Sequence, residues 1–109
     1  MNREVGERLD DVVRACEVIR RYVEEDGLPD DLVCDAVRMR LVEIGQAVRT
    51  LPPAVTSSEP DIPWSRVSLL GERLTGHTAD AAPAVVLRTA WVDVPALRDA
   101  VVRLRAAQP

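Results

Sequence analysis

Residues 3–25 read REVGERLDDVVRACEVIRRYVEE, and this stretch decides the fold class. Its apolar residues recur at alternating steps of four and three, which is the spacing of one buried face on an α-helix. They are Val5, Leu9, Val12, Cys16, Ile19 and Val23. Charged residues fill most other positions, with opposite charges four residues apart such as Asp10–Arg14 and Glu17–Arg21. The stretch therefore predicts a long amphipathic helix.

The same apolar spacing returns in the next segment, after a turn at Gly27. Residues 30–51 carry the second stripe, which Pro52 and the following proline end. Gly45 lies inside this predicted helix, where a glycine costs about 1 kcal/mol relative to alanine. We therefore expect another helix to approach closely at Gly45. The short connection makes the first two helices an antiparallel hairpin.

A proline- and serine-rich segment at about residues 52–62 is the predicted loop of the molecule. A third helix is expected to start near Pro63, because proline is favoured in the first turn of a helix. Apolar residues continue on one side of it as far as Gly76, which is the expected end of this helix.

The last third of the chain predicts two more helices. One runs from about Ala82 to Val92, and the other opens at Pro95 with Asp93 as its N-cap. No segment alternates apolar and polar residues with a period of two, so no strand is expected. The sequence predicts an all-α, antiparallel bundle of four to five helices, with residues 1–109 forming one domain.

The composition limits the partners and the location of the protein. The formal net charge is −4, which argues against a broad nucleic-acid platform but leaves room for a local basic cleft. No signal-like N-terminus and no apolar run of roughly 20 residues is present, so we expect a cytoplasmic protein that does not enter membranes. Cys16 and Cys34 lie on the apolar stripes and are expected to be buried and reduced, with a disulfide or metal pair as the alternative.

Few residues could carry chemistry. The five glycines are scattered, so no phosphate loop is indicated, and no cofactor is expected. Two cysteines and one histidine make a poor metal set, so no metal is expected either. His77 follows Arg73 by four residues, and the two could share one helical face. Such a pair could cleave RNA, with His77 as general acid or base and Arg73 neutralising a phosphate. The alternative is a solvated pair at the end of a helix.

Three motifs in order carry a family resemblance. Residues 35–48 read DAVRMRLVEIGQAV, residues 62–64 read Ile-Pro-Trp, and residues 93–98 read DVPALR. In this order and spacing they resemble the HepT-like toxins of the HEPN superfamily. The resemblance covers nearly the whole chain and implies a HEPN/HepT-like helical fold that assembles as a homodimer.

The resemblance also implies a function. Active members are ribonuclease toxins encoded beside an MntA-like nucleotidyltransferase antitoxin, so RNA and that antitoxin are the implied partners. The family signature is an arginine, usually followed by asparagine, then a histidine five residues after the arginine and a tyrosine two residues further on. The arginine and histidine line a cleft at the dimer interface. The tyrosine is where the antitoxin attaches AMP, which silences the toxin.

In this chain the signature positions hold other residues. Counting from the tryptophan of the Ile-Pro-Trp motif places Gly71 at the arginine position and Glu72 at the asparagine position. The same count places Gly76 at the histidine position and Thr78 at the tyrosine position. Continued without a gap, it reaches Pro95, the proline of the third motif. Thr78 has a hydroxyl and is the candidate modification site by this count.

Arg73 and His77 are of the right types but do not lie at the family positions. Three residues separate them, whereas the family has at least four, and a helix turns about 100° per residue. We therefore predict a family member without ribonuclease activity that acts as a dimeric binding or regulatory module. Two alternatives stay open: a ribonuclease that uses Arg73 and His77 in a shifted arrangement, and a helical scaffold that only binds a partner.

Overall fold

The computed structural model describes residues 3–75 and 82–109, and the side chains of residues 4–72 and 82–109. Every regular element in these ranges is helical, which confirms the all-α prediction. The elements are α1 (Arg3–Glu24), α2 (Asp30–Arg49), α3 (Pro53–Thr56), α4 (Trp64–Ser68), α5 (Leu70–Thr75), α6 (Pro83–Arg88), the π-helical turn η2 (Thr89–Asp93) and α7 (Val94–Ala106).

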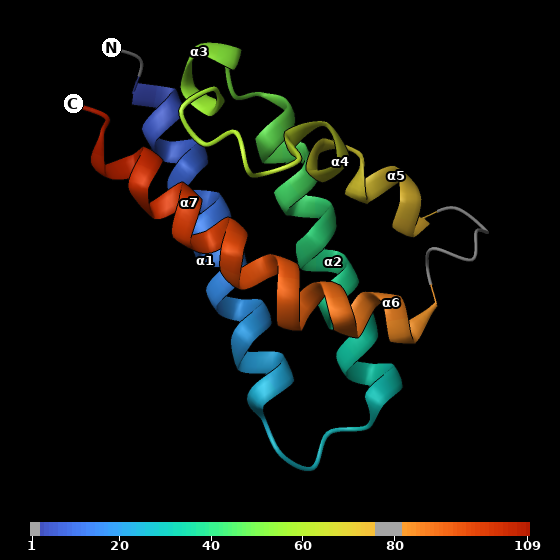
Figure 1. Cartoon of the computed structure of the whole chain (residues 1–109). Helices are drawn as coiled ribbons and strands as arrows, with labels where there is room; N and C mark the ends of the chain where they lie inside the picture. Colours follow the sequence, from blue (N-terminus) through green and yellow to red (C-terminus); the bar gives the residue numbers. More distant parts are fainter. Residues whose placement is uncertain (1–2, 76–81) are drawn as a thin grey trace.

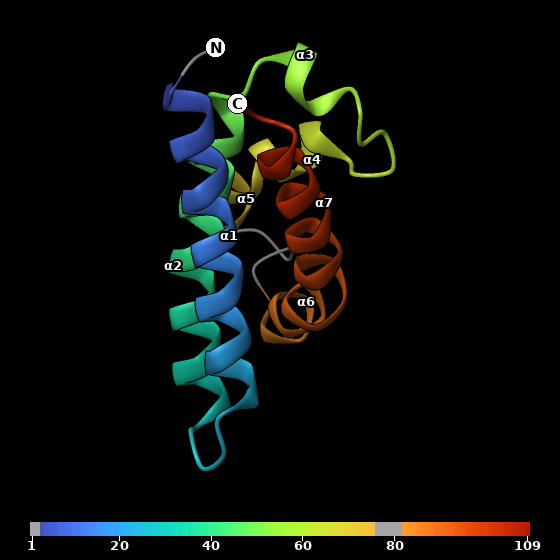
Figure 2. The same ribbon diagram turned by 90° about the vertical axis from the view of Figure 1, so that its left-hand side faces the viewer.

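The two longest predicted helices, α1 and α2, lie side by side and antiparallel, as expected (Figure 1). Gly27 lies in the turn between them with a φ of +84°. Glycine adopts this left-handed conformation without the steric cost that a side chain would bring. Figure 2 shows the hairpin edge-on as one layer, with α6 and α7 packed against one of its faces.

The predicted fourth and fifth helices form one continuous helix from residue 83 to residue 106. Asp93 has helical φ and ψ angles of −80° and −37° and makes no capping hydrogen bond with its side chain, so the prediction of an N-cap was wrong. The helix passes Pro95 because the preceding turn is π-helical, with the N–H of Val94 donating to the carbonyl of Thr89. In a π-helical turn each backbone N–H bonds to the carbonyl five residues earlier rather than four. Pro95, which has no backbone N–H, follows Val94 directly.

The predicted third helix is interrupted in the middle. It consists of α4 and α5, which meet at Leu69, where φ is −96° and ψ is 0°. A guanidinium nitrogen of Arg49 on α2 donates to the carbonyl of Ser68 at a distance of 2.9 Å. Because Arg49 satisfies a carbonyl at the end of α4, the chain can change direction there without leaving that group unpaired.

The core lies between the hairpin and the α6–η2–α7 helix and is aliphatic. Among the described residues, every buried side chain is apolar. The largest ones with almost no exposure are Leu9, Val12, Ile19, Val37, Leu41, Ile44, Val86 and Val101. Trp64 and Tyr22 pack at its edge, whereas Trp91 is exposed. No helix in the described ranges is long and apolar enough to cross a bilayer.

Two of the charge pairs expected within the first helix are replaced by pairs between helices. Asp10 accepts a hydrogen bond from Arg105 on α7 at 2.9 Å, and Glu17 is paired with Arg98 on α7 at 3.5 Å. Both carboxylates lie near the edge of the α1 face that α7 covers, so an arginine from the neighbouring helix reaches them. These contacts therefore join α1, the first helix of the chain, to α7, the last.

Candidate functional site

The structure describes only part of the predicted active site. The backbone of Arg73 belongs to α5, but its side chain is outside the described atoms. Gly76, His77 and Thr78 lie outside the described residues. The pairing of Arg73 with His77 and the surroundings of Thr78 therefore stay predictions. Of the counted positions, the structure describes Trp64, Gly71, Glu72 and Pro95.

Gly71 faces α2. A Cβ atom on Gly71 would lie 3.6 Å from Cγ1 and 3.8 Å from Cα of Val42. Opposite it, a Cβ atom on Gly45 would lie 3.1 Å from the carbonyl oxygen of Val67 and 3.3 Å from the Gly71 nitrogen. The backbones of α2 and of the α4–α5 segment therefore approach closely, which confirms the expectation at Gly45. Residue 71 takes part in this helix packing.

Glu72 makes an ion pair with α2. Its Oε1 lies 3.1 Å from the Arg49 nitrogen that also donates to the Ser68 carbonyl. The pair is largely exposed, with 53% of the Arg49 side chain and 65% of the Glu72 side chain accessible. Arg49 was not predicted as part of this region, because 23 residues separate it from Glu72 and no local pattern links them. The arrangement connects the start of α5 to α2.

The tryptophan of the Ile-Pro-Trp motif fixes the preceding turn. The indole N–H of Trp64 donates to the carbonyl of Glu59 at 3.0 Å. The Glu59 carboxylate in turn accepts hydrogen bonds from Arg103 on α7, with Nη2 at 2.6 Å from Oε1 and Nε at 3.2 Å from both oxygens. These hydrogen bonds hold the pKa of Glu59 below its ordinary value. The motif therefore anchors the loop before α4 to α7.

The Glu59–Arg103 contact predicts a pH-dependent stability. Because the pKa of Glu59 is lower in the folded than in the unfolded protein, the contact stabilises the fold above the unfolded pKa of about 4.3 and is lost as the pH falls through the folded value. Glu59→Gln should therefore lower the Tm at pH 7, and this difference should shrink below about pH 4. Thermal unfolding followed by circular dichroism at both pH values measures it.

The matched control for this experiment is Glu72→Gln. It removes an ion pair whose carboxylate side chain is 65% exposed, whereas that of Glu59 is 19% exposed. The Tm change at pH 7 should be smaller for Glu72→Gln, because solvent screens exposed pairs. An equal Tm difference between wild type and Glu59→Gln at pH 7 and pH 3 would contradict the assignment.

Both cysteines are buried free thiols. Burial raises the pKa of Cys16 to about 12, and burial also raises the pKa of Cys34. The Cys34 thiol donates to the carbonyl of Pro83 at 3.7 Å. In the described ranges, no group of three or more His, Cys, Asp or Glu residues lies together in a way that could hold a metal ion. The cysteines therefore act as small apolar core residues.

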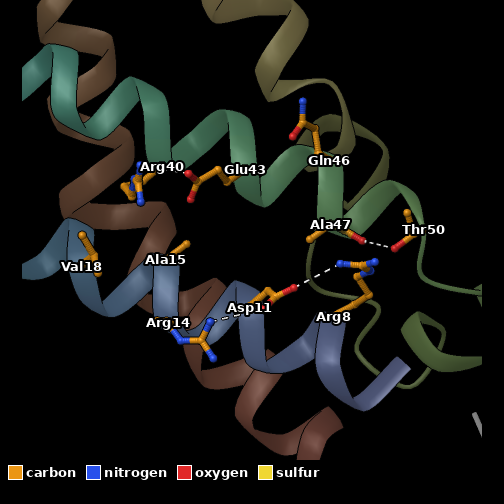
Figure 3. Close-up of a pocket in the computed structure, with 10 residues that line it drawn as sticks. All are labelled: Arg8, Asp11, Arg14, Ala15, Val18, Arg40, Glu43, Gln46, Ala47 and Thr50. Carbon is orange, nitrogen blue, oxygen red and sulfur yellow. Dashed lines mark hydrogen bonds and ion pairs between the residues drawn. The ribbon is translucent and has the colours of Figure 1, made fainter. Parts of the chain in front are cut away.

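A polar groove of about 540 Å³ runs along the hairpin between α1 and α2 (Figure 3). Arg8, Asp11 and Arg14 line it from α1, and Arg40 and Glu43 line it from α2. Small side chains, Gln46 and Thr50 complete the lining. A sequence cannot distinguish these residues from ordinary surface charges, because their convergence depends on the register between two helices.

A second pocket of about 330 Å³ lies between the Ile-Pro-Trp segment and the π-helical turn. Its lining is largely apolar and includes Leu41, Leu70 and Leu97. The charged residues in its lining are Asp61, Arg66 and Asp93. The pocket lies next to the motif but includes neither Gly71 nor Glu72.

Comparison with known proteins identifies the family. The profile of the family described as "Ribonuclease HepT-like" matches residues 10–104. The chain belongs to the HepT-like family. It is similar to a protein named "Probable ribonuclease HepT" from Thermococcus cleftensis, with 27% identity over 110 residues that cover 96% of this chain and 99% of that protein. No solved structure matches.

The HepT-like match includes the segment from the Ile-Pro-Trp motif to residue 104 in α7, so it contains the three motifs that carry the resemblance. Within this HepT-like fold, the described positions 71 and 72 contact α2 through a glycine and a surface ion pair. Gly71 has no side-chain group that could act on a substrate, and the carboxylate of Glu72 is paired with Arg49.

Proposed function

We propose that this HepT-like protein has no ribonuclease activity and acts as a dimeric binding or regulatory module. The observation that supports this most is the environment of Gly71, the residue at the family's arginine position. A side chain there would start against Val42 on α2, with its Cβ in ordinary contact at 3.6 Å. The residue lies in ordinary contact with α2, and as a glycine it offers no side-chain group to a substrate.

The chemistry of RNA cleavage explains why the substitutions matter. Cleavage needs a cation near the scissile phosphate and a group that transfers a proton. Glycine at positions 71 and 76 supplies neither. Glu72 adds a negative charge where the family usually has a neutral amide, and a carboxylate opposes the approach of a phosphate. Arg49 offsets that charge by pairing with it.

The second candidate is a ribonuclease that uses Arg73 and His77. The residue types favour it, since guanidinium and imidazole are suited to phosphate binding and proton transfer. The register opposes it, because Arg73 is displaced by two residues from the family position and about 100° of helix rotation separates successive residues. The two candidates differ in their effect on a cell.

Expression in bacteria distinguishes the two candidates. An inactive protein is expected to leave growth unchanged while full-length soluble protein accumulates. A shifted ribonuclease would arrest growth, and either Arg73→Ala or His77→Ala would relieve the arrest. Growth curves of the wild type and of both variants, at matched protein levels, provide the measurement. Growth arrest that either substitution abolishes would overturn the proposal.

The proposed partners follow from the family. We infer a cytoplasmic homodimer in which residues 1–109 form one domain, with an MntA-like nucleotidyltransferase as the antitoxin-type partner. Thr78 is the candidate site for nucleotide transfer by such a partner, although its alcohol is far less acidic than a phenol. Light scattering tests the dimer. Co-purification with a nucleotidyltransferase encoded by a neighbouring gene, followed by mass spectrometry of residue 78, tests the partner and the modification.

A further inference from the structure

The pocket between the Ile-Pro-Trp segment and the π-helical turn has an apolar floor and a charged mouth. Leu41 and Leu97 belong to the floor and are 1% and 4% exposed. The charged residues of the lining are exposed and lie at the opening: Asp61, Arg66 and Asp93. The cavity holds about 330 Å³, and pockets that bind small ligands have about 300–1,000 Å³. The pocket is therefore large enough for a small molecule.

The two walls of this pocket offer different polar groups. On the η2 wall, the hydroxyl of Thr89 donates to the carbonyl of Val85 at 2.9 Å, so its oxygen can only accept a hydrogen bond from a ligand. The carboxylate of Asp93, at the end of the same turn, also only accepts. On the α4 wall, the guanidinium of Arg66 only donates. A ligand with a donor toward η2 and an acceptor toward α4 therefore matches both walls.

The charged groups at the mouth are not neutralised within the described part of the chain. None of Asp61, Arg66 and Asp93 makes an ion pair with another described residue. Other arginines that contact this region, Arg49 and Arg103, are each paired with a carboxylate. Groups of both signs thus line one cavity without pairing with each other. A ligand that carries both charges would pair with each of them.

We propose that this pocket binds a small zwitterion with an apolar side chain, namely a free α-amino acid such as leucine. The ammonium group pairs with Asp93 and Asp61, the carboxylate pairs with Arg66, and the side chain occupies the apolar floor. Two carboxylates and one guanidinium give the mouth a formal charge of −1, so it favours the ammonium over the carboxylate. The lining includes neither Gly71 nor Glu72. The binding therefore does not depend on whether the protein cleaves RNA.

The test is an NMR titration of the isotope-labelled full-length protein with leucine and three related probes. Of these, 3-methylbutylamine lacks the carboxylate, 4-methylpentanoate lacks the ammonium group, and glycine lacks the apolar side chain. Leucine is expected to bind most tightly and to shift the amide signals of Leu70, Thr89 and Leu97 until they saturate. Glycine is expected not to bind, because it leaves the apolar floor in contact with water.

Two variants test the roles of the mouth and of the space within the pocket. Arg66→Gln is expected to weaken leucine binding about tenfold, as the loss of a hydrogen bond between charged groups would. It should not weaken the binding of 3-methylbutylamine, which has no carboxylate. Ala96→Leu puts a larger side chain at the exposed edge of the pocket and should weaken the binding of both probes.

Arg88→Gln is the matched control for Arg66→Gln. Arg88 is exposed and, like Arg66, makes no ion pair with another described residue, but it does not line the pocket. It should leave the affinity for leucine unchanged, although it changes the net charge equally. Circular dichroism of every variant checks that the helices are intact.

Absence of saturable shifts with leucine overturns the proposal. Binding of glycine as tight as that of leucine also overturns it, because the attraction would then come from charge alone. If 3-methylbutylamine binds as tightly as leucine, Arg66 does not receive a carboxylate and the assignment of a zwitterion is wrong. Equal weakening by Arg66→Gln and Arg88→Gln would likewise overturn it. Since the readout is binding, none of these failures bears on the proposed absence of ribonuclease activity.

Discussion

Gly45→Leu is expected to lower the free energy of unfolding by about 3 kcal/mol, as overpacking at a tight contact does. The atoms that a Cβ on residue 45 would meet are the Val67 carbonyl oxygen at 3.1 Å and the Gly71 nitrogen at 3.3 Å. Both are backbone atoms, which cannot turn aside as the end of a flexible side chain can. A leucine would therefore push the α4–α5 segment away from α2. Urea unfolding followed by circular dichroism measures the loss.

Gly6→Ala and Gly71→Ala are the controls for this substitution. The atoms nearest to a Cβ on Gly6 would be those of the flexible guanidinium of Arg105, at 3.3 Å, and a Cβ on Gly71 would be in ordinary contact with Val42. Both variants should gain up to about 1 kcal/mol from the higher helix propensity of alanine. If Gly45→Leu instead unfolds at the same urea concentration as the wild type, then α2 does not contact the α4–α5 backbone at this point.

Leu41→Ala is expected to lower the free energy of unfolding by about 3 kcal/mol, which is within the range for substitutions that create a cavity in a core. Leu41 is 1% exposed and belongs to the aliphatic core between the hairpin and the α6–η2–α7 helix. Among the described residues, no buried side chain of that core is aromatic, so removing three carbons leaves space that the neighbours can fill only in part. The loss would be a large fraction of the roughly 5–15 kcal/mol that stabilises a typical domain.

Met39→Ala is the matched control for Leu41→Ala on the same helix. Met39 is 56% exposed, so its truncation should change the free energy of unfolding by no more than about 0.5 kcal/mol. Chemical unfolding of the two variants gives the comparison. A Leu41→Ala variant as stable as Met39→Ala would place residue 41 outside the core.

The fold could be predicted from the sequence where one regular apolar spacing dominates a segment. The prediction failed where a local helix-start pattern competed with the apolar spacing. The apolar spacing in α1 and α2 is long and regular, so both helices were predicted within two residues of their ends. Asp93 followed by Pro95 resembles the start of a helix, but the core contacts of Ala90, Val94 and Leu97 keep the helix continuous through a π-helical turn. Burial of apolar side chains outweighed the local signal.

For the candidate site, the sequence could predict only which residues occupy the positions of the family signature. Counting from Trp64 identified the residues at the family positions, and the family match supports the order of the motifs. It could not show that Gly71 faces Val42 or that Arg49 reaches Glu72, since both contacts join segments far apart in sequence. Fold and activity can separate in this way, because the fold depends on the core and activity on a few side chains.

Incubation of the purified protein with single-stranded RNA and tRNA tests the central claim most directly. Cleavage by the wild type is expected to stay at the level of buffer alone, and Arg73→Ala and His77→Ala are expected to change nothing. Robust cleavage by the wild type that disappears in the His77→Ala variant, with the helical content of that variant intact, would contradict it.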